Sequence, residues 1–316
     1  MRLAKAILVR LIFGVLSLLF VSFVAFVADE AAPGDASTAL AGEKADAATR
    51  ARIRENLGLN RPWPIRYAEF VGNAAKGDFG KSYAGTKEDV RVIIARNLPM
   101  TLRIASLAIL LAALVGITLG TIAAVYENRF SDRTILLFST LGITVPNFVL
   151  APLLVYVFSL KLDVLPQSWE VEQRAPLFFY LALPVLVLSL RPMTMLTRLT
   201  RASMVETIKQ EFFRLAIAKG VPPRRLIFSH ALRNAILPVI TSASSSFGFL
   251  LTGSFVVERY FTLPGIGREG IEAIQRGDMP VVQAVVMITG AMFIAINLLV
   301  DLLLPILDPR IREARI

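Results

Sequence analysis

The chain has 316 residues, of which 55% are hydrophobic and 18% charged, and its formal net charge at pH 7 is +10. The mean hydropathy of +0.63 exceeds that of ordinary soluble domains, and the positive charges lie at the ends of apolar stretches, where membrane topology rather than nucleic-acid binding accounts for them. Without cysteine, and with His230 as the single histidine, the chain has no means of forming a disulfide, a thiolate metal site or a histidine metal cluster.

Six apolar stretches predict six transmembrane helices. A spanning helix needs about 20 apolar residues, at about 1.5 Å each, to cross a hydrocarbon core of roughly 30 Å. The sequence therefore predicts an all-α membrane protein with one transmembrane domain over residues 1–316. The predicted spans cover, approximately, residues 8–28, 100–126, 134–160, 176–197, 234–257 and 279–307.

The first stretch also has an interpretation as a cleavable signal peptide, because basic residues precede it. However, Leu11–Ala28 holds no charge over 18 residues, which is longer than the usual apolar region of about 7–15 residues in such signals. No clean small-x-small cleavage site follows before the acidic pair Asp29-Glu30. We therefore interpret this stretch as a membrane anchor.

The distribution of Lys and Arg predicts the orientation of the chain. The short segments on one side carry 16 of these residues and those on the other side carry 5. The side richer in Lys and Arg faces the cytoplasm, so both termini and the loop 198–233 are predicted to be cytoplasmic. Residues 29–99 then form a long extracytoplasmic loop between spans 1 and 2 of a multi-pass protein of the cell (inner) membrane.

Within this long loop, residues from Ala45 to Leu59 favour a helix. Further on, Trp63, Tyr67, Phe70 and Val71 recur at helical spacing. One interpretation is an amphipathic helix at the membrane interface, where Trp and Tyr are enriched. The other is a docking surface for an extracytoplasmic partner. The two are compatible, and the first is favoured.

Polar residues inside the apolar stretches are candidates for a translocation path, because such residues usually face the interior of a helix bundle or a cavity. Close helix packing is the alternative and commoner role for small polar residues, and Asp301 has a structural role as its alternative. Arg191, near the predicted cytoplasmic end of the fourth span, can extend toward the membrane surface. The path candidates are Thr144, Asn147, Ser242, Ser245, Ser246, Asn297 and Asp301.

The loop between the fourth and fifth spans predicts two short helices joined by a fixed turn. The first covers Ser203–Ala218 and is ended by Gly220, and Pro222-Pro223 is expected to delay the second until Leu226. In the first helix one face is predicted to hold Met204, Ile208, Phe212, Leu215 and Ala216. The alternative is a solvated basic connection. Against it stands the apolar content, which something must cover: Phe212, Phe213, Leu215, Ile217, Leu226, Ile227 and Phe228.

Two nucleotide-binding motifs are matched only by coincidence. Gly265–Gly270 fits G-x-G-x-x-G, but it lies in a short loop between two spans and lacks the strand that a dinucleotide site requires. Gly80-Lys81-Ser82 resembles the end of a phosphate-binding loop, but Ala75 stands where the leading glycine should be. We therefore expect no nucleotide site in this chain.

Long segments of the chain resemble one family. The segment RASMVETIKQEFFRLAIAKGVPPRRLIFSHALRNAILPVIT, from Arg201 to Thr241, is similar to the cytoplasmic loop of binding-protein-dependent ABC importer permeases. The resemblance is closest to the first permease subunit of the dipeptide, oligopeptide and nickel importers. It extends to Leu57–Tyr83, Asn97–Gly120, Glu258–Ile274 and Asn297–Arg312. One departure is Arg214-Leu215, where the wider family pattern has Glu-Ala, so the role of that glutamate does not transfer to Arg214.

The resemblance implies the type I ABC importer permease fold and a set of partners. These are a second homologous permease subunit, two ATP-binding subunits, an extracytoplasmic solute-binding protein and the lipid bilayer, with no nucleic acid. It implies no cofactor in this chain, since ATP and Mg²⁺ would be held by the ATPase subunits. The residues implied to couple to an ATPase are Phe212, Ala216, Ala218, Lys219, Gly220, Pro222, Arg224 and Arg225.

The function implied is a channel-forming permease that imports dipeptides or oligopeptides by alternating access and has no catalytic site. Import of nickel or another small solute through the same fold is the alternative within this class. An ion-coupled secondary transporter is an alternative from another class, but Asp301 is nearly alone as an intramembrane carboxylate and no inverted repeat is visible. A membrane enzyme is disfavoured, since paired carboxylates, HExxH and Gly-x-Ser-x-Gly are absent from the sequence.

Overall fold

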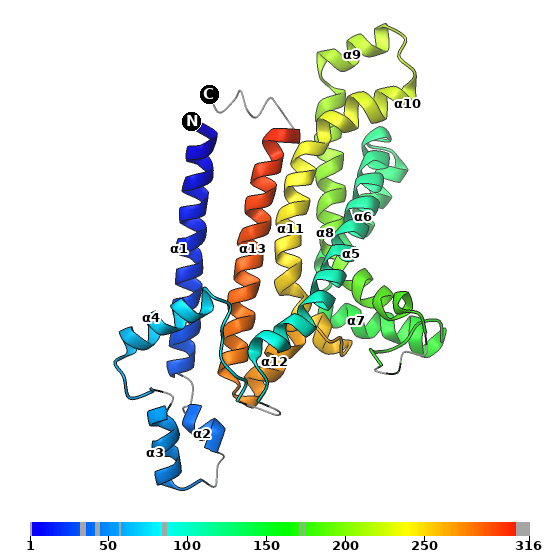
Figure 1. The fold of residues 1–316 in the computed structure, drawn as a ribbon. Coiled ribbons are helices and arrows are strands. Elements are labelled where there is room, and N and C mark those ends of the chain that lie inside the picture. The colour runs from blue at the N-terminus through cyan, green and yellow to red at the C-terminus, as the bar shows by residue number, and fades with distance from the viewer. Residues whose placement is uncertain are drawn as a thin grey trace. The chain divides into compact units, whose positions relative to one another are not determined.

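The computed structural model describes residues 2–31, 36–41, 45–56, 58–83, 87–170, 172 and 175–307. Within them every regular element is a helix, and the bridge between Lys81 and Asp89 is isolated. This confirms the all-α prediction. The helices in Figure 1 are α1 (Arg2–Ala31), α2 (Ala36–Ala41), α3 (Ala47–Asn56), α4 (Trp63–Ala74), α5 (Val90–Val125), α6 (Phe130–Thr144), α7 (Asn147–Val155), α8 (Leu177–Ile208), α9 (Glu211–Ala218), α10 (Pro223–Arg225), α11 (Arg233–Tyr260), α12 (Ile266–Arg276) and α13 (Met279–Leu307), with π-helical segments η1 (Tyr156–Lys161) and η2 (Leu226–Leu232).

Five of the described helical segments are long and apolar enough to cross a membrane. They are Leu8–Ala31, Val90–Val125, Leu177–Ile208, Pro223–Tyr260 and Met279–Val300. A sixth candidate consists of Phe130–Thr144 and Asn147–Lys161, which are bent by 106° with respect to each other. The bend falls at Pro146, whose backbone is extended (φ −65°, ψ 147°). Proline has no N–H for a helical hydrogen bond and disfavours the helical conformation of the residue before it, so the helix ends here.

The chain divides into two compact units, and α5 and α13 contribute to both. One unit comprises Met1–Thr101 and Leu263–Ala295, and the other comprises Leu102–Thr262 and Ile296–Ile316. Each unit has its own packed interior and is described separately below.

In the first unit, α4 packs its aromatic face on α1. The ring of Tyr67 meets the rings of Phe23 and Phe26 edge-on, with centroids 5.6 and 5.4 Å apart. Arg66 forms an ion pair of 2.9 Å with Glu30 near the end of α1. The helical spacing noted in the sequence therefore does produce a helix, and much of its aromatic face is covered by protein.

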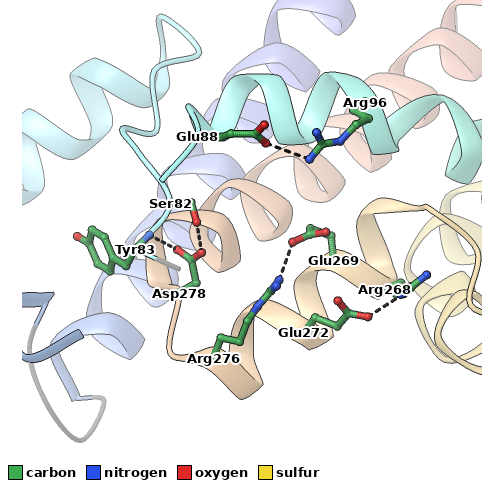
Figure 2. A network of polar contacts seen from close by, with 9 residues as sticks. All are labelled: Ser82, Tyr83, Glu88, Arg96, Arg268, Glu269, Glu272, Arg276 and Asp278. Carbon is green, nitrogen blue, oxygen red and sulfur yellow. Dashed lines mark hydrogen bonds and ion pairs between the residues drawn. The ribbon is translucent and has the colours of Figure 1, made fainter. Parts of the chain in front are cut away.

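The segment that mimics a phosphate-binding loop is an anchor in this unit (Figure 2). Asp278, between α12 and α13, is buried and accepts a hydrogen bond from the hydroxyl of Ser82 and another, of 2.9 Å, from the backbone N–H of Tyr83. Burial, with the nearby carboxylates of Asp29 and Asp278, raises the pKa of Tyr83 to about 12. Ser82 thus fixes the chain before α5.

The glycines of the dinucleotide-like motif serve packing in the same unit. Gly267 and Gly270 lie on α12 and are buried. A Cβ atom on Gly270 would lie 3.0 Å from Cγ1 of Val285 on α13, so the two helices approach closely at this point. Along α12, Arg276 pairs with Glu269 and Arg268 with Glu272, both at 2.7 Å (Figure 2).

In the second unit, α8 packs against α6, α7 and α11. Glycines of α5 also permit a close approach of α5 to α8, as is common for small residues between membrane helices. A Cβ atom on Gly116 or Gly120 of α5 would lie 2.8 or 2.5 Å from the carbonyl oxygen of Met193 or Thr197 on α8, respectively. Buried Ala112, Leu196 and Val239 join α5, α8 and α11 in one apolar core.

Candidate functional site

The loop between α8 and α11 differs from its prediction first because the helix expected over 203–218 is split. α8 ends at Ile208, Gln210 is extended (φ −74°, ψ 153°), and α9 begins at Glu211. The helical phase therefore restarts at α9, where Phe213 and Ala216 are buried while Leu215 is 61% exposed. The predicted common face of Met204, Ile208, Phe212, Leu215 and Ala216 is consequently wrong.

Gly220 ends α9 in a Schellman motif. The N–H of Val221 donates to the carbonyl of Ala216 at 3.2 Å, and that of Gly220 donates to the carbonyl of Ile217 at 2.9 Å. Gly220 has φ +74°, in the left-handed region where a side chain is disfavoured. The turn therefore has a single well-defined conformation.

The next helix begins earlier than expected. Pro222 is extended (φ −64°, ψ 145°), but Pro223 is already the first residue of α10. Proline suits this position because its N–H would have no helical partner there. The helix then continues through η2 into α11 and ends at Tyr260, so the turn at Gly220 is joined to a membrane helix without interruption.

We call residues 211–232 the helical loop. Its buried side chains form one core with those of the long helices of the same unit. Figure 1 shows α9 and α10 beyond the ends of α8 and α11. The core residues are Ala124 of α5, Met204 of α8, Phe213 and Ala216 of α9, Leu226 and Ala231 of η2, and Ala235 of α11. Displacement of the loop would therefore move the ends of these helices as well.

Two ion pairs attach the start of α6 and the connection before it to the C-terminal part of α8 and to Lys209, which follows α8. Arg201 donates from Nε and Nη2 to the two carboxylate oxygens of Asp132, at 2.5 and 2.6 Å. Lys209 pairs with Glu127 at 3.1 Å. The first pair is bidentate, with the Asp132 side chain only 2% exposed, so it holds these helices in a fixed relation.

The outer surface of the helical loop is apolar with a basic border. Phe212 is 38%, Leu215 61%, Ile217 53% and Phe228 56% exposed. Of the predicted coupling residues, Ala216 is buried and has little surface for a partner to contact. The others, Phe212, Ala218, Lys219, Gly220, Pro222, Arg224 and Arg225, are exposed, as is Arg214. We call the exposed side chains between positions 212 and 228 the loop surface.

A second candidate site is a cavity of about 540 Å³ between α7, α8 and α11. It brings together Asn147 and Ser246, two of the predicted path residues, with Thr252 and with Arg191, which was expected to extend toward the membrane surface. Further walls are provided by Leu188, Pro192, Met195, Phe249, Leu250 and Gly253.

The remaining path candidates do not line this cavity. Thr144 is exposed, and its hydroxyl donates to the carbonyl of Thr140 at 2.9 Å. Ser245 is exposed, and Ser242 is partly buried, with no hydrogen-bond partner for its hydroxyl among the described residues. Asn297 is partly buried on α13, and the side chain of Asp301 lies outside the described part of the structure. The described residues include no group of three or more His, Asp or Glu side chains that could hold a metal ion.

These features define an all-helical membrane protein, and comparison with known proteins gives its family. Residues 116–313 match the family model described as binding-protein-dependent transport system inner membrane component. Residues 3–105 match the N-terminal model of the corresponding membrane components. The chain therefore belongs to the family of binding-protein-dependent transport system inner membrane components, which are the permease subunits of such importers.

Relatives match over nearly the whole chain. A probable peptide ABC transporter permease protein (y4tP) of Sinorhizobium fredii is 36% identical over 309 residues, which are 97% of this chain and 98% of the relative. The glutathione transport system permease protein GsiC of Escherichia coli is also 36% identical, over 96% of this chain and 98% of its own. A solved structure of the MetNI methionine ABC transporter in inward-facing conformations matches with a TM-score of 0.58, at 14% identity, over 68% of this chain and 96% of that chain. This likeness confirms the predicted importer permease fold.

Proposed function

We propose that this permease imports dipeptides or oligopeptides across the cytoplasmic membrane and that the loop surface docks in a groove of an ATP-binding subunit. The names of the relatives support the cargo, since one is named as a peptide permease and the other as a permease for glutathione, itself a small peptide. The helical loop and both termini would face the cytoplasm, as the distribution of Lys and Arg indicates.

The proposed assembly contains a second homologous permease, two ATP-binding subunits and an extracytoplasmic solute-binding protein. ATP and Mg²⁺ would be held by the ATP-binding subunits, and this chain would perform no bond chemistry. Closure of the two ATP-binding subunits would move the helical loops with them, and this motion would open the path alternately to the two sides. Such coupling requires that the loop be held differently in the two states.

The observation that carries the proposal is the exposed apolar surface on a rigidly held loop. Phe212, Leu215, Ile217 and Phe228 remain exposed although the loop has its own core. Full burial of such a side chain contributes about 1.5–3 kcal/mol, so a groove that covers several of them would hold the loop firmly. Arg224 and Arg225 at the border would meet acidic or polar groups of that groove.

The test reverses the charge of this border. We expect an importer with Arg224→Glu and Arg225→Glu to insert normally but to take up peptide at least about 10-fold more slowly, because docking that transmits the motion is weakened. Uptake in proteoliposomes and copurification with the ATP-binding subunits measure the two effects. The matched control is Arg133→Glu, an exposed arginine elsewhere in the same unit.

Each assumption of the proposal has its own contrary outcome. Wild-type uptake that continues without the ATP-binding subunits, or that requires an ion gradient, would exclude ATP coupling. Uptake of nickel but not of peptide would exclude dipeptides and oligopeptides as the cargo. Unchanged uptake by the doubly substituted importer would exclude the role of the loop surface.

A further inference from the structure

Arg191 is a cation within an apolar membrane helix, where an ionised side chain needs a partner. It lies on α8 within the apolar stretch 176–197, and its side chain is exposed. In the part of the chain that the structure describes, it forms no hydrogen bond and no ion pair. Ten residues further along the same helix, Arg201 is fully engaged by Asp132. Because an ionised side chain in a membrane helix is costly, it is expected to face a water-filled cavity or an anionic group.

The cavity lined by Arg191 provides such a setting. Its volume of about 540 Å³ lies within the range, about 300–1,000 Å³, of cavities that hold small molecules. Asn147 contributes an amide at the start of α7, where the helix dipole also favours a negative charge. Ser246 and Thr252 contribute hydroxyl groups from α11.

The hydrogen bonds of these hydroxyls determine what they can offer a ligand. Ser246 donates its proton to the carbonyl of Ser242 at 2.8 Å, and Thr252 donates to the carbonyl of Phe249 at 3.1 Å. Both oxygens therefore keep lone pairs that can accept a hydrogen bond. The cavity thus combines a guanidinium that binds anions with two acceptors suited to N–H groups.

We propose that this cavity is a binding site for the transported solute, in which Arg191 receives the C-terminal carboxylate of a peptide. This deepens the proposed function and rests on it. The planar guanidinium matches a carboxylate with two parallel hydrogen bonds. The acceptors of Ser246 and Thr252 receive N–H groups of the peptide. Met195 and Phe249, which are exposed in the cavity wall, contact its side chains without selecting a particular one.

The test measures occupancy of the cavity without the solute-binding protein, whose own preference would otherwise interfere. The chain contains no cysteine, so the Met195→Cys variant has a single thiol, and this thiol lies in the cavity wall. The rate at which a maleimide modifies this thiol is followed by the mass of the subunit in the complete importer, purified in detergent. The ligands are a dipeptide at millimolar concentration, the same dipeptide with an amidated C-terminus, and inorganic phosphate.

We expect the dipeptide to slow the modification and the amidated dipeptide to have little effect. With Arg191→Gln the affinity for the free acid should fall about 10- to 100-fold, which corresponds to the loss of hydrogen bonds to a charged group. The difference between the two dipeptides should then disappear. Arg103→Gln is the matched control, since Arg103 is exposed in the same unit and does not line the cavity, and it should preserve the difference.

Several outcomes would overturn the inference. They are equal protection by the free and amidated dipeptides, protection that survives Arg191→Gln, and protection by phosphate as strong as that by the dipeptide, which would indicate an anionic headgroup instead. If Arg191→Gln prevents assembly, Arg191→Lys is used instead, since it retains the positive charge but not the two parallel hydrogen bonds of the guanidinium. It should weaken protection by the free-acid dipeptide and leave the small effect of the amidated dipeptide unchanged. If the importer takes up peptide but the thiol of Met195→Cys is not protected, only this inference is refuted, whereas no peptide uptake would refute the proposed function.

Discussion

Two of the three arginines of α8, Arg191 and Arg201, illustrate how the same side chain serves different purposes within one helix. Arg201 meets Asp132 through two hydrogen bonds, and Asp132 also accepts from the backbone N–H of Asn128 at 2.8 Å. Asn128 has φ +63°, a conformation that asparagine tolerates better than most residues and that directs its N–H toward the carboxylate. Asp132 is thus held by the turn and by α8, whereas Arg191 has no such partner in the part of the chain that the structure describes.

Removal of Arg201 should be costly, because Asp132 would remain buried without a cation. We expect Arg201→Ala to destabilise the permease by about 3–5 kcal/mol, the usual effect of breaking a buried pair on one side. The midpoint of thermal unfolding of the purified importer measures the change. Arg96→Ala serves as the control, since its pair with Glu88 is 57% and 37% exposed and should contribute no more than about 1 kcal/mol. Equal shifts for both substitutions would contradict this assignment.

At the scale of helices, the sequence predicted the end of α9 at Gly220 but placed the start of the next helix at Leu226, three residues later than Pro223, where it begins. The bend at Pro146 and the end of α9 at Gly220 follow from backbone geometry, which a single residue dictates. The break at Lys209-Gln210 contains neither residue and was not predicted. There the interior decides, because Phe213 and Ala216 can reach the core with Met204 only if the helical phase restarts.

The cavity and the loop surface, like the helix boundaries, were predicted only in part. Residue type selected Asn147 and Ser246 as path candidates, whereas the family resemblance selected Arg224 and Arg225 as coupling residues. It could not show that Arg191 shares a cavity with the first two, since the cavity depends on how α7, α8 and α11 pack. In the same way, the apolar pattern of the helical loop did not reveal which of its side chains the chain itself covers.

The contact of α5 with α8 allows a prediction for an element. A Cβ atom on Gly120 would lie 2.5 Å from the carbonyl oxygen of Thr197 and 2.6 Å from Cβ of Thr200, so the helices must separate to admit it. We expect Gly120→Ala to cost about 1–3 kcal/mol, as overpacking of a close contact does. In Gly72→Ala, on α4, the added Cβ meets nothing within 4 Å, and it should be neutral or slightly stabilising. Thermal unfolding of the two variants distinguishes them, and a neutral Gly120→Ala would show that the helices have room to separate.

At the scale of the whole molecule, membership of the family follows from matches over residues 3–105 and 116–313, which together extend over most of both compact units. Orientation has a different basis, since it depends on the asymmetry of 16 against 5 basic residues in short segments. Charge asymmetry acts during insertion, and it leaves no trace in the packing of helices. The sidedness of the chain is therefore a separate prediction that needs its own measurement.

The absence of cysteine makes this measurement direct. Lys219→Cys, beside the turn at Gly220, and Lys76→Cys, just after α4, both replace exposed residues that the orientation places on opposite sides of the membrane. A membrane-impermeant maleimide should modify the thiol of Lys76→Cys in intact cells and that of Lys219→Cys only in inside-out vesicles. The unsubstituted chain, which has no thiol, is the control.

The Lys219→Cys variant also tests the partner of the loop surface. In vesicles that retain the ATP-binding subunits, its thiol should react more slowly than in vesicles from which they have been stripped, because the loop surface would be covered. Modification of both variants from the same side would refute the orientation. An equal rate for Lys219→Cys with and without the ATP-binding subunits would leave the loop surface without its proposed partner.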